Sequence, residues 1–307
     1  MIDFHLREYR LCSDLQRLSM IIDGKKVAEE IQQEIKAKIE LLSGRPPCLA
    51  VILVGKHPPS QIYIRRKIQA CASVGIQFIL IELPDVISEE NLLLKVRELN
   101  ENPLVDGILV QLPLPSHINP AHITHSILPD KDVDGFNPYN VGKMLIGETN
   151  GFIPCTPLGI KVLLERYSIE IAGKHVLVIG RSNIVGKPMA ALLIQSAPGG
   201  NATVTIAHRH TTGLKNLCQI ADIIITAIGQ PKFITADMVK EGAVVVDVGI
   251  NKINDPTQKN GYLIVGDVDF ANVASKCAYI TPVPGGVGPM TIAMLLQNTV
   301  QSFEQHK

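Results

Sequence analysis

Apolar and polar residues alternate along the chain in blocks that predict strands and helices in turn from about residue 48 onward. The apolar runs are short and continuous, a pattern typical of strands buried on both faces of a parallel sheet. The first series has expected strands at 48–54, 77–83 and 107–112. Its expected helices lie at 61–74, capped by Ser60, and at 89–100, where apolar residues form one stripe.

A second series of the same kind begins after the segment Pro154-Cys155-Thr156-Pro157. Its expected strands are 175–179, 203–207, 222–228 and 243–248, and its expected helices are 157–167 and about 289–303. Two such series predict an α/β protein with two domains: an N-terminal α/β domain and a C-terminal Rossmann-type parallel-sheet domain, with a cleft between them. The expected divisions are 1–19, 20–156, 157–288 and 289–307.

Charge and composition exclude several classes of function. The 29 basic and 29 acidic residues balance, so nothing points to nucleic acid or to an anionic membrane surface. No apolar stretch approaches the roughly 20 residues that a membrane span needs. The 6 cysteines form no C-x-x-C pair, which indicates reduced thiols and a cytoplasmic location. Residues 1–19 carry arginines without an apolar core, so we expect a non-structural extension and no secretory signal.

A glycine-containing loop follows the expected strand 175–179 and opens a helix, where Rossmann-type units bind the dinucleotide phosphates. Gly180 permits the tight turn, and Gly186 lets helix and strand approach. The spacing departs from G-x-G-x-x-G, because Ser182 replaces the middle glycine and the last glycine comes one residue late. A structural glycine turn without a ligand is the alternative.

The end of the expected strand 203–207 bears on the choice of cofactor. NAD sites usually place an acidic residue there for the ribose hydroxyls, but this strand ends in His208-Arg209-His210. Arg181 and Arg209 can both reach a 2′-phosphate, which favours NADP. The alternative is that Arg209 is a solvated loop cation.

Four other features suggest a chemical site. Tyr63 and Lys67 lie four residues apart on one helix face, and burial can lower the pKa of such a lysine. Gln111 ends an apolar strand, where open α/β sheets bind ligands. The acidic loop 129–136 contains Asp134 before Gly135, which predicts a tight turn that directs one carboxylate inward. The loop 281–291 is rich in proline and glycine. Taken singly, three of these features have alternative interpretations. The helix with Lys67 can be a solvated basic face, the loop 129–136 a solvated acidic loop, and the loop 281–291 a rigid linker.

Three histidines, His117, His122 and His125, cluster in one loop, and the i, i+3 pair raises the question of a metal. They have no cysteine or placed carboxylate beside them in the sequence. We therefore interpret them as solvated loop histidines and expect no metal.

Five motifs, in this order, resemble the methylenetetrahydrofolate dehydrogenase/cyclohydrolase family. The likeness runs from about Met20 to the end of the chain. The motifs are Tyr63-Ile64-x-x-Lys67, the segment 107–115 (GILVQLPLP), the segment 131–136 (KDVDGF), Gly180-Arg181-Ser182 and the segment 282–291 (PVPGGVGPMT).

The resemblance implies oxidation of 5,10-methylenetetrahydrofolate to 5,10-methenyltetrahydrofolate with NADP, followed by hydrolysis to 10-formyltetrahydrofolate. It implies a homodimer built through the second domain and a C-terminal helix, 289–307, that returns to the first. It implies a catalytic set of Lys67, Tyr63, Gln111 and Asp134. Folate contacts would add Leu112, Pro113, Pro284, Gly285 and Gly286. Cofactor contacts would be Gly180, Arg181, Ser182, Ile184, Val185, Arg209, Ile250, Gly288 and Thr291.

Small departures from the family pattern keep alternatives open. Gln69 stands where relatives often carry a second basic residue, and Arg209 stands where several NADP-using relatives carry serine. The long loop 197–200 resembles NAD-preferring, magnesium- and phosphate-dependent relatives. The alternatives are a monofunctional NAD-dependent dehydrogenase of this fold, an amino-acid or shikimate dehydrogenase, and a non-catalytic binding module.

Overall fold

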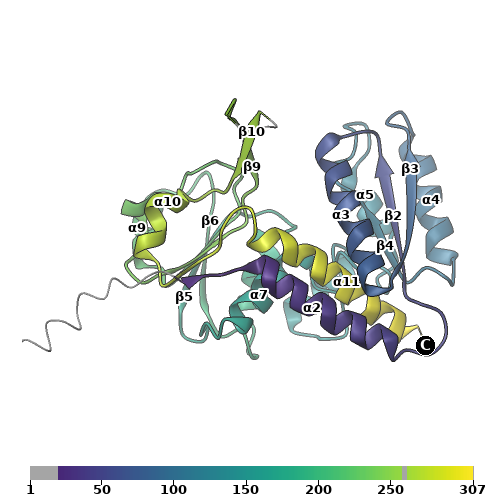
Figure 1. Ribbon diagram of the computed structural model, residues 1–307, viewed down its shortest axis with the longest axis horizontal. Coiled ribbons are helices and arrows are strands. Elements are labelled where there is room, and N and C mark those ends of the chain that lie inside the picture. The colour runs from purple at the N-terminus through teal and green to yellow at the C-terminus, as the bar shows by residue number, and fades with distance from the viewer. Residues whose placement is uncertain (1–19, 258–260, 307) are drawn as a thin grey trace, which may run out of the picture.

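The computed structural model describes residues 20–257 and 261–306, which form two α/β units joined by long helices (Figure 1). The expected extension at 1–19 lies outside the described residues. No helix in the described part of the chain is long and apolar enough to cross a membrane.

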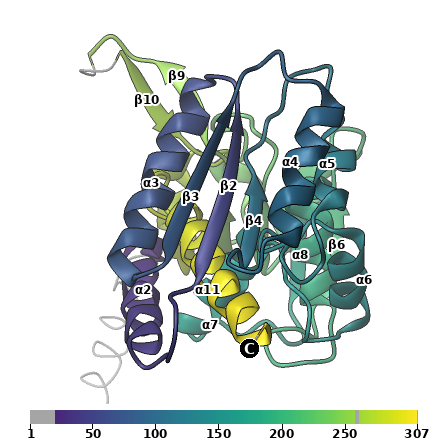
Figure 2. The same cartoon turned by 90° about the vertical axis from the view of Figure 1, so that its right-hand side faces the viewer.

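The first unit is built on a three-stranded parallel sheet in the order β3-β2-β4. Residues of the central strand point alternately to two faces. Leu49, Val51 and Leu53 pack into one apolar cluster, and Ala50 and Ile52 pack into another. Helices therefore cover both faces, as Figure 2 shows. The elements are β2 (Cys48–Val54), α3 (Pro58–Val74), β3 (Gln77–Leu83), α4 (Glu89–Glu101), β4 (Gly107–Val110), α5 (Pro120–Ser126) and α6 (Pro138–Ile146).

Helix α3 begins earlier than the sequence pattern predicts. His57 is its N-cap residue and proline occupies its first positions, where a missing N–H costs no helical hydrogen bond. The prediction that Ser60 caps this helix is wrong. Ser60 lies within the first turn, and its hydroxyl is 3.1 Å from His57 Nδ1.

The second unit contains a six-stranded parallel sheet in the order β1-β11-β8-β7-β5-β6. A two-stranded antiparallel ribbon, β9-β10, projects from it (Figure 1). The strands are β1 (Met20–Ile21), β5 (His175–Ile179), β6 (Thr203–Ala207), β7 (Ile223–Thr226), β8 (Val244–Asp247), β9 (Asn251–Asn254), β10 (Tyr262–Val265) and β11 (Tyr279–Ile280). The helices are α7 (Cys155–Arg166), α8 (Gly186–Leu193), α9 (Leu214–Ile220) and α10 (Phe270–Val273), with 3-10 turns at Ala236–Met238 and Ala274–Lys276.

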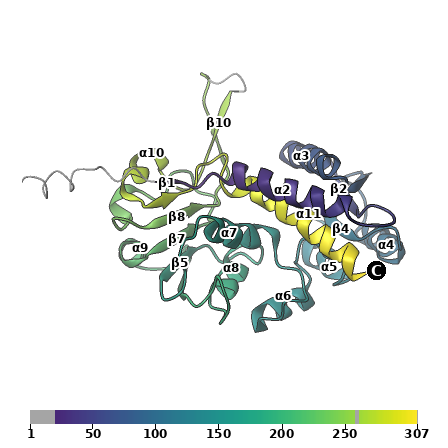
Figure 3. The same cartoon turned by 60° about the horizontal axis from the view of Figure 1, so that its bottom comes forward.

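Two long helices, α2 (Gly24–Glu40) and α11 (Val287–Gln305), run side by side from one unit to the other (Figure 3). Helix α11 also contacts α7, α3 and the strands β2 and β4. Strand β1 differs from the expected division of the chain, because it joins the second sheet. The N–H of Met20 donates to Ala278 O at 2.9 Å, and that of Ile22 to Ile280 O at 2.8 Å.

Candidate active site

The buried amine of Lys67 is the most chemically distinctive group of the first unit. The residue is 8% exposed, because neighbouring positions of α3 pack into the core. Within the described chain, its Nζ makes one hydrogen bond, to Gln111 Oε1 at 3.0 Å. Burial lowers the pKa of Lys67, and the nearby carboxylate of Asp134 and thiol of Cys155 oppose that shift. An amine with a lowered pKa gives up its proton more readily than an ordinary lysine does.

Gln111 is held in place to accept that hydrogen bond. Its backbone N–H donates to Ile52 O at 2.9 Å, which continues the ladder between β4 and β2. Its side-chain Nε2 donates to Leu112 O at 2.8 Å. With the amide nitrogen engaged there, Oε1 faces Lys67. The helix face and the strand end that the sequence predicts as chemical features therefore meet.

Two charged residues of the loop before α6, Lys131 and Asp132, make hydrogen bonds that stabilise neighbouring helices. The Lys131 ammonium donates to the carbonyls of Asn100 and Asn102, each at 2.8 Å, and so caps the end of α4. The Asp132 carboxylate accepts from Asn137 N at 2.7 Å and from Asn140 Nδ2 at 3.0 Å, and so fixes the start of α6.

Asp134 is the remaining carboxylate of this motif. The tight turn expected at Asp134-Gly135 is present: Gly135 has φ 75°, and its N–H donates to Asp132 O at 3.0 Å. An added Cβ on Gly135 would lie 2.6 Å from Pro154 N, so the turn packs directly on the 153–154 backbone. Burial raises the pKa of Asp134, while Lys67 and the Cys155 thiol lower it. The carboxylate thus shares an electrostatic environment with the Lys67 amine.

The loop after β5 has the shape that a dinucleotide requires. Gly180 has φ 130°, and an added Cβ would lie 2.5 Å from Ala227 O. A Cβ on Gly186 would overlap the carbonyl of Gly180, so strand end and helix start meet without side chains between them. The Ser182 hydroxyl accepts from Val185 N at 3.1 Å and Gly186 N at 3.4 Å. The Val185 side chain is buried, which leaves only its backbone for a ligand.

The segment after β6 contains no carboxylate that would repel a 2′-phosphate. Arg209 is exposed, and its Nε donates to His210 Nε2 at 3.2 Å. Arg181 is exposed as well. A glycine turn, a helix start and two exposed guanidinium groups fit NADP, with its additional 2′-phosphate, better than NAD.

A cavity of about 720 Å³ lies between the two units. Leu112, Phe136 and Val141 line it from the first unit, and Ile184 and Lys187 from the second. Leu112 and Ile184, which are expected folate and cofactor contacts, line the cavity, whereas Lys67, Tyr63, Gln111 and Asp134 are not among its described lining residues.

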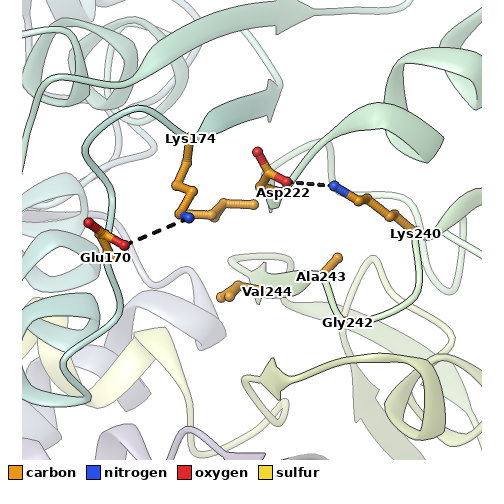
Figure 4. Close-up of a pocket in the computed structure, with 8 residues that line it drawn as sticks. Glu170, Lys174, Asp222, Lys240, Gly242, Ala243 and Val244 are labelled. Carbon is orange, nitrogen blue, oxygen red and sulfur yellow. Dashed lines mark hydrogen bonds and ion pairs between the residues drawn. The ribbon is translucent and has the colours of Figure 1, made fainter.

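A second pocket, of about 160 Å³, lies at the opposite edge of the larger sheet, where β5, β7 and β8 begin (Figure 4). Its lysines are paired: Lys240 with Asp222 at 2.6 Å and Lys174 with Glu170 at 3.7 Å. It contains none of the expected site residues, and ligands of open α/β sheets bind at the other strand ends.

Comparison with known proteins identifies the two units. Residues 22–134 match the family model described as the tetrahydrofolate dehydrogenase/cyclohydrolase catalytic domain, and residues 154–307 match its NAD(P)-binding domain. The chain belongs to the tetrahydrofolate dehydrogenase/cyclohydrolase family. It therefore carries both the catalytic and the NAD(P)-binding part of an enzyme of tetrahydrofolate interconversion. A non-catalytic module and an amino-acid or shikimate dehydrogenase are excluded.

Individual members of the tetrahydrofolate dehydrogenase/cyclohydrolase family are similar over nearly the whole chain. The bifunctional protein FolD of Protochlamydia amoebophila is 69% identical over 286 residues, which cover 93% of this chain and 98% of that protein. The structure of the bifunctional enzyme FolD from Campylobacter jejuni has 48% identity and a TM-score of 0.89, covering 94% and 100% of the two chains. That of the Trypanosoma brucei enzyme, complexed with NADP cofactor and inhibitor, has 41% identity and a TM-score of 0.88, covering 94% and 98%. The expected α/β class with two domains is confirmed.

The proline- and glycine-rich loop of the family packs against the start of α2 and leads into α11. The Gly285 carbonyl accepts from Lys25 N at 2.9 Å, and a Cβ on Gly24 would overlap the carbonyl of Gly286. Gly286 is buried by this packing, whereas Pro284 is exposed. Farther along, a Cβ on Gly288 would lie 4.0 Å from Ile250, and the Thr291 hydroxyl is 2.9 Å from that of Thr156.

Two buried aspartates that sequence reasoning missed shape the cofactor side. Asp267 accepts from the N–H groups of Ile228 at 2.8 Å and Gln230 at 2.9 Å. Asp247 accepts from Gly249 N and Asp267 N, each at 2.9 Å, and burial raises its pKa to about 6. They fix the loops at the ends of β7 and β8, next to Ile250. The sequence does contain a signal for Asp247, because this carboxylate directly follows the apolar run 243–246 at the end of an expected strand.

Proposed function

We propose that Lys67, Gln111, Tyr63 and Asp134 carry out the folate chemistry of this enzyme, and that the 180–186 loop holds NADP. The observation that carries the proposal is the buried Lys67 amine, which has one hydrogen-bond partner among the described residues and lies near the Asp134 carboxylate. Burying a cation without an ion-pair hydrogen bond is costly, so such a group indicates a functional role.

In the first reaction the protein positions two reactants. Asp134 holds the polar edge of the pterin, Tyr63 stacks on the folate, and Leu112 and Pro113 complete that wall. NADP, when bound, supplies the hydride acceptor. Gly180, Arg181 and Ser182 would hold its phosphates, and Ile184, Ile250, Gly288 and Thr291 would line its path to the folate. Orientation of this kind is the main contribution of a protein to hydride transfer.

In the second reaction water adds to the methenyl carbon. Lys67, in its neutral form, accepts a proton from that water as the C–O bond forms. The bond from this carbon to N5 then breaks with its electron pair going to N5, which takes the proton back from Lys67. The hydroxyl proton is lost to solvent as the C=O bond forms, and 10-formyltetrahydrofolate remains. Gln111 keeps the Lys67 amine directed at the reacting carbon. A monofunctional NAD-dependent dehydrogenase, which carries out hydride transfer alone, would have less use for this arrangement.

The test is Lys67→Met, with Arg65→Met as the matched control, because Arg65 is an exposed cation on the same helix. Absorbance is followed as methylenetetrahydrofolate is added with NADP and then with NAD. We expect Lys67→Met to lose hydrolysis by about 100-fold or more while the fold survives, so that methenyl product accumulates. Hydrolysis at the wild-type rate would remove Lys67 from this role, and faster reduction of NAD than NADP would overturn the cofactor assignment.

We also propose a homodimer built through the second domain and a cytoplasmic location. Strand β6 is the outer strand of its sheet, and Ile206 on it is 40% exposed. An uncovered sheet edge with an apolar side chain is suited to pairing with a second copy. The cysteines in the described part of the chain are unpaired and buried, as in a reducing compartment.

A further inference from the structure

A buried amide in the middle of α11 connects the C-terminal helix to the folate site. Asn298 is 1% exposed. Its Nδ2 donates to Val133 O at 2.9 Å and to Ile153 O at 3.2 Å, and it lies 3.7 Å from Cys155 Sγ. The Cys155 thiol donates to the same Val133 carbonyl at 3.3 Å. The amide therefore joins three segments that are far apart in the sequence.

The contact between Asn298 and Val133 lies directly beside Asp134 in the chain, so it can affect the orientation of that carboxylate. The Val133 carbonyl belongs to the peptide group that leads into Asp134, and a peptide group is planar. Holding that oxygen fixes the plane from which the Asp134 side chain departs. On the other side of Asp134, Gly135 packs against the 153–154 backbone, whose Ile153 carbonyl also accepts from Asn298. The turn is thus held from both sides by one amide.

We propose that Asn298 is a positioning residue for folate binding: through the Val133 carbonyl it sets the direction of the Asp134 carboxylate toward Lys67 and the substrate. This rests on the proposed role of Asp134. Asn298 touches neither reactant, and its effect is exerted only through the turn.

The same helix provides a matched control. Ser302 lies one helical turn beyond Asn298 and is also buried. Its hydroxyl is 2.6 Å from Asp106 O and 2.7 Å from Asp130 O, so it also ties α11 to this loop, but away from Asp134. Loss of either tether removes a buried hydrogen bond. Only loss of the Asn298 tether should change the orientation of the Asp134 carboxylate.

The experiment is a double-mutant cycle on the full-length enzyme, with the KM for methylenetetrahydrofolate and the KM for NADP as readouts. Asn298→Leu should raise the folate KM roughly tenfold, the factor expected for one or two hydrogen bonds, and leave the NADP KM unchanged. In an Asp134→Ala background, Asn298→Leu should cause no further rise in the folate KM. Ser302→Ala should lower the melting temperature without changing the folate KM.

An equal rise from Asn298→Leu in both backgrounds, or no rise in either, overturns the inference. If Asp134→Ala itself leaves the folate KM unchanged, the proposed role of Asp134 fails, which is a separate result. If Asn298→Leu does not fold, Asn298→Ser replaces it, because the serine hydroxyl keeps one hydrogen-bond donor at this position. The folate KM is again compared between the wild-type and Asp134→Ala backgrounds.

Discussion

A single buried lysine has its basicity set by two opposing influences. Desolvation disfavours the charged form of Lys67, while the Asp134 carboxylate favours it. Gln111 accepts a hydrogen bond from either form of the amine and therefore fixes its position in both. The balance between burial and one carboxylate then decides the pH range over which the amine can act as a base.

That balance predicts the pH dependence of hydrolysis. The neutral amine is the active form, so the rate should rise with pH through the pKa of Lys67, which burial places below the ordinary 10.5. Asp134→Asn removes the charge that raises this pKa, so the rising limb should move to lower pH. The measurement is kcat for hydrolysis against pH at saturating substrate. A limb near 10.5, or a shift to higher pH in the variant, would contradict the assignment.

Local patterns in the sequence drew attention to Lys67, Gln111 and Asp134, and the family resemblance then implied their roles. Helix face, strand end and turn are properties of a few neighbouring residues, and parallel strand ends meet at one edge. The Asn298–Val133 contact could not be predicted in this way, since it joins residues 165 positions apart. Such a contact depends on how the finished units pack.

At the scale of elements, the junction of β5 and α8 depends on the absence of side chains. The Gly186 position meets the Gly180 carbonyl so closely that no other residue fits without moving the loop. The sequence predicted this close approach and most strands and crossover helices. It missed α2, although Val27, Ile31 and Ile35 have helical spacing, because the strand-helix alternation begins only at β2. The short strands β1 and β11 carry too few residues to show a period.

Gly186→Ala should therefore weaken NADP binding and lower stability, because the added methyl displaces the phosphate loop. Gly142→Ala is the control: it lies in α6 with nothing within 4 Å of an added Cβ. That variant should gain about 0.4–1 kcal/mol of unfolding free energy through helix propensity. Urea unfolding and the KM for NADP test both. Wild-type stability and KM in Gly186→Ala would show that the loop tolerates a side chain.

At the scale of the whole molecule, the two units are packed together through shared helices. Helices α2 and α11 pack along each other and contact both, so the relative placement of the folate and nucleotide sides depends on their shared apolar faces. The cavity between the units is one product of that placement. The edge strand β6 is the surface that we propose for pairing with a second copy.

The proposed dimer predicts that size-exclusion chromatography with light scattering gives twice the monomer mass of 33.4 kDa. Ile206→Lys, which places a charge on the β6 edge, should shift the protein toward monomer. Lys215→Ala, an exposed substitution elsewhere in the same unit, should not. A monomeric wild type, or a dimer unaffected by Ile206→Lys, would overturn this interface.

The pairing of β1 with β11 has a consequence for how the protein is made. The ribosome synthesises β1 and α2 long before their partners β11 and α11. While the chain is still attached to the ribosome, the second sheet lacks its outer strands and α2 has an uncovered apolar face. Neither unit can be completed before α11 has been synthesised, although domains usually fold in order as they emerge. We expect the growing chain to need protection from aggregation until α11 has emerged.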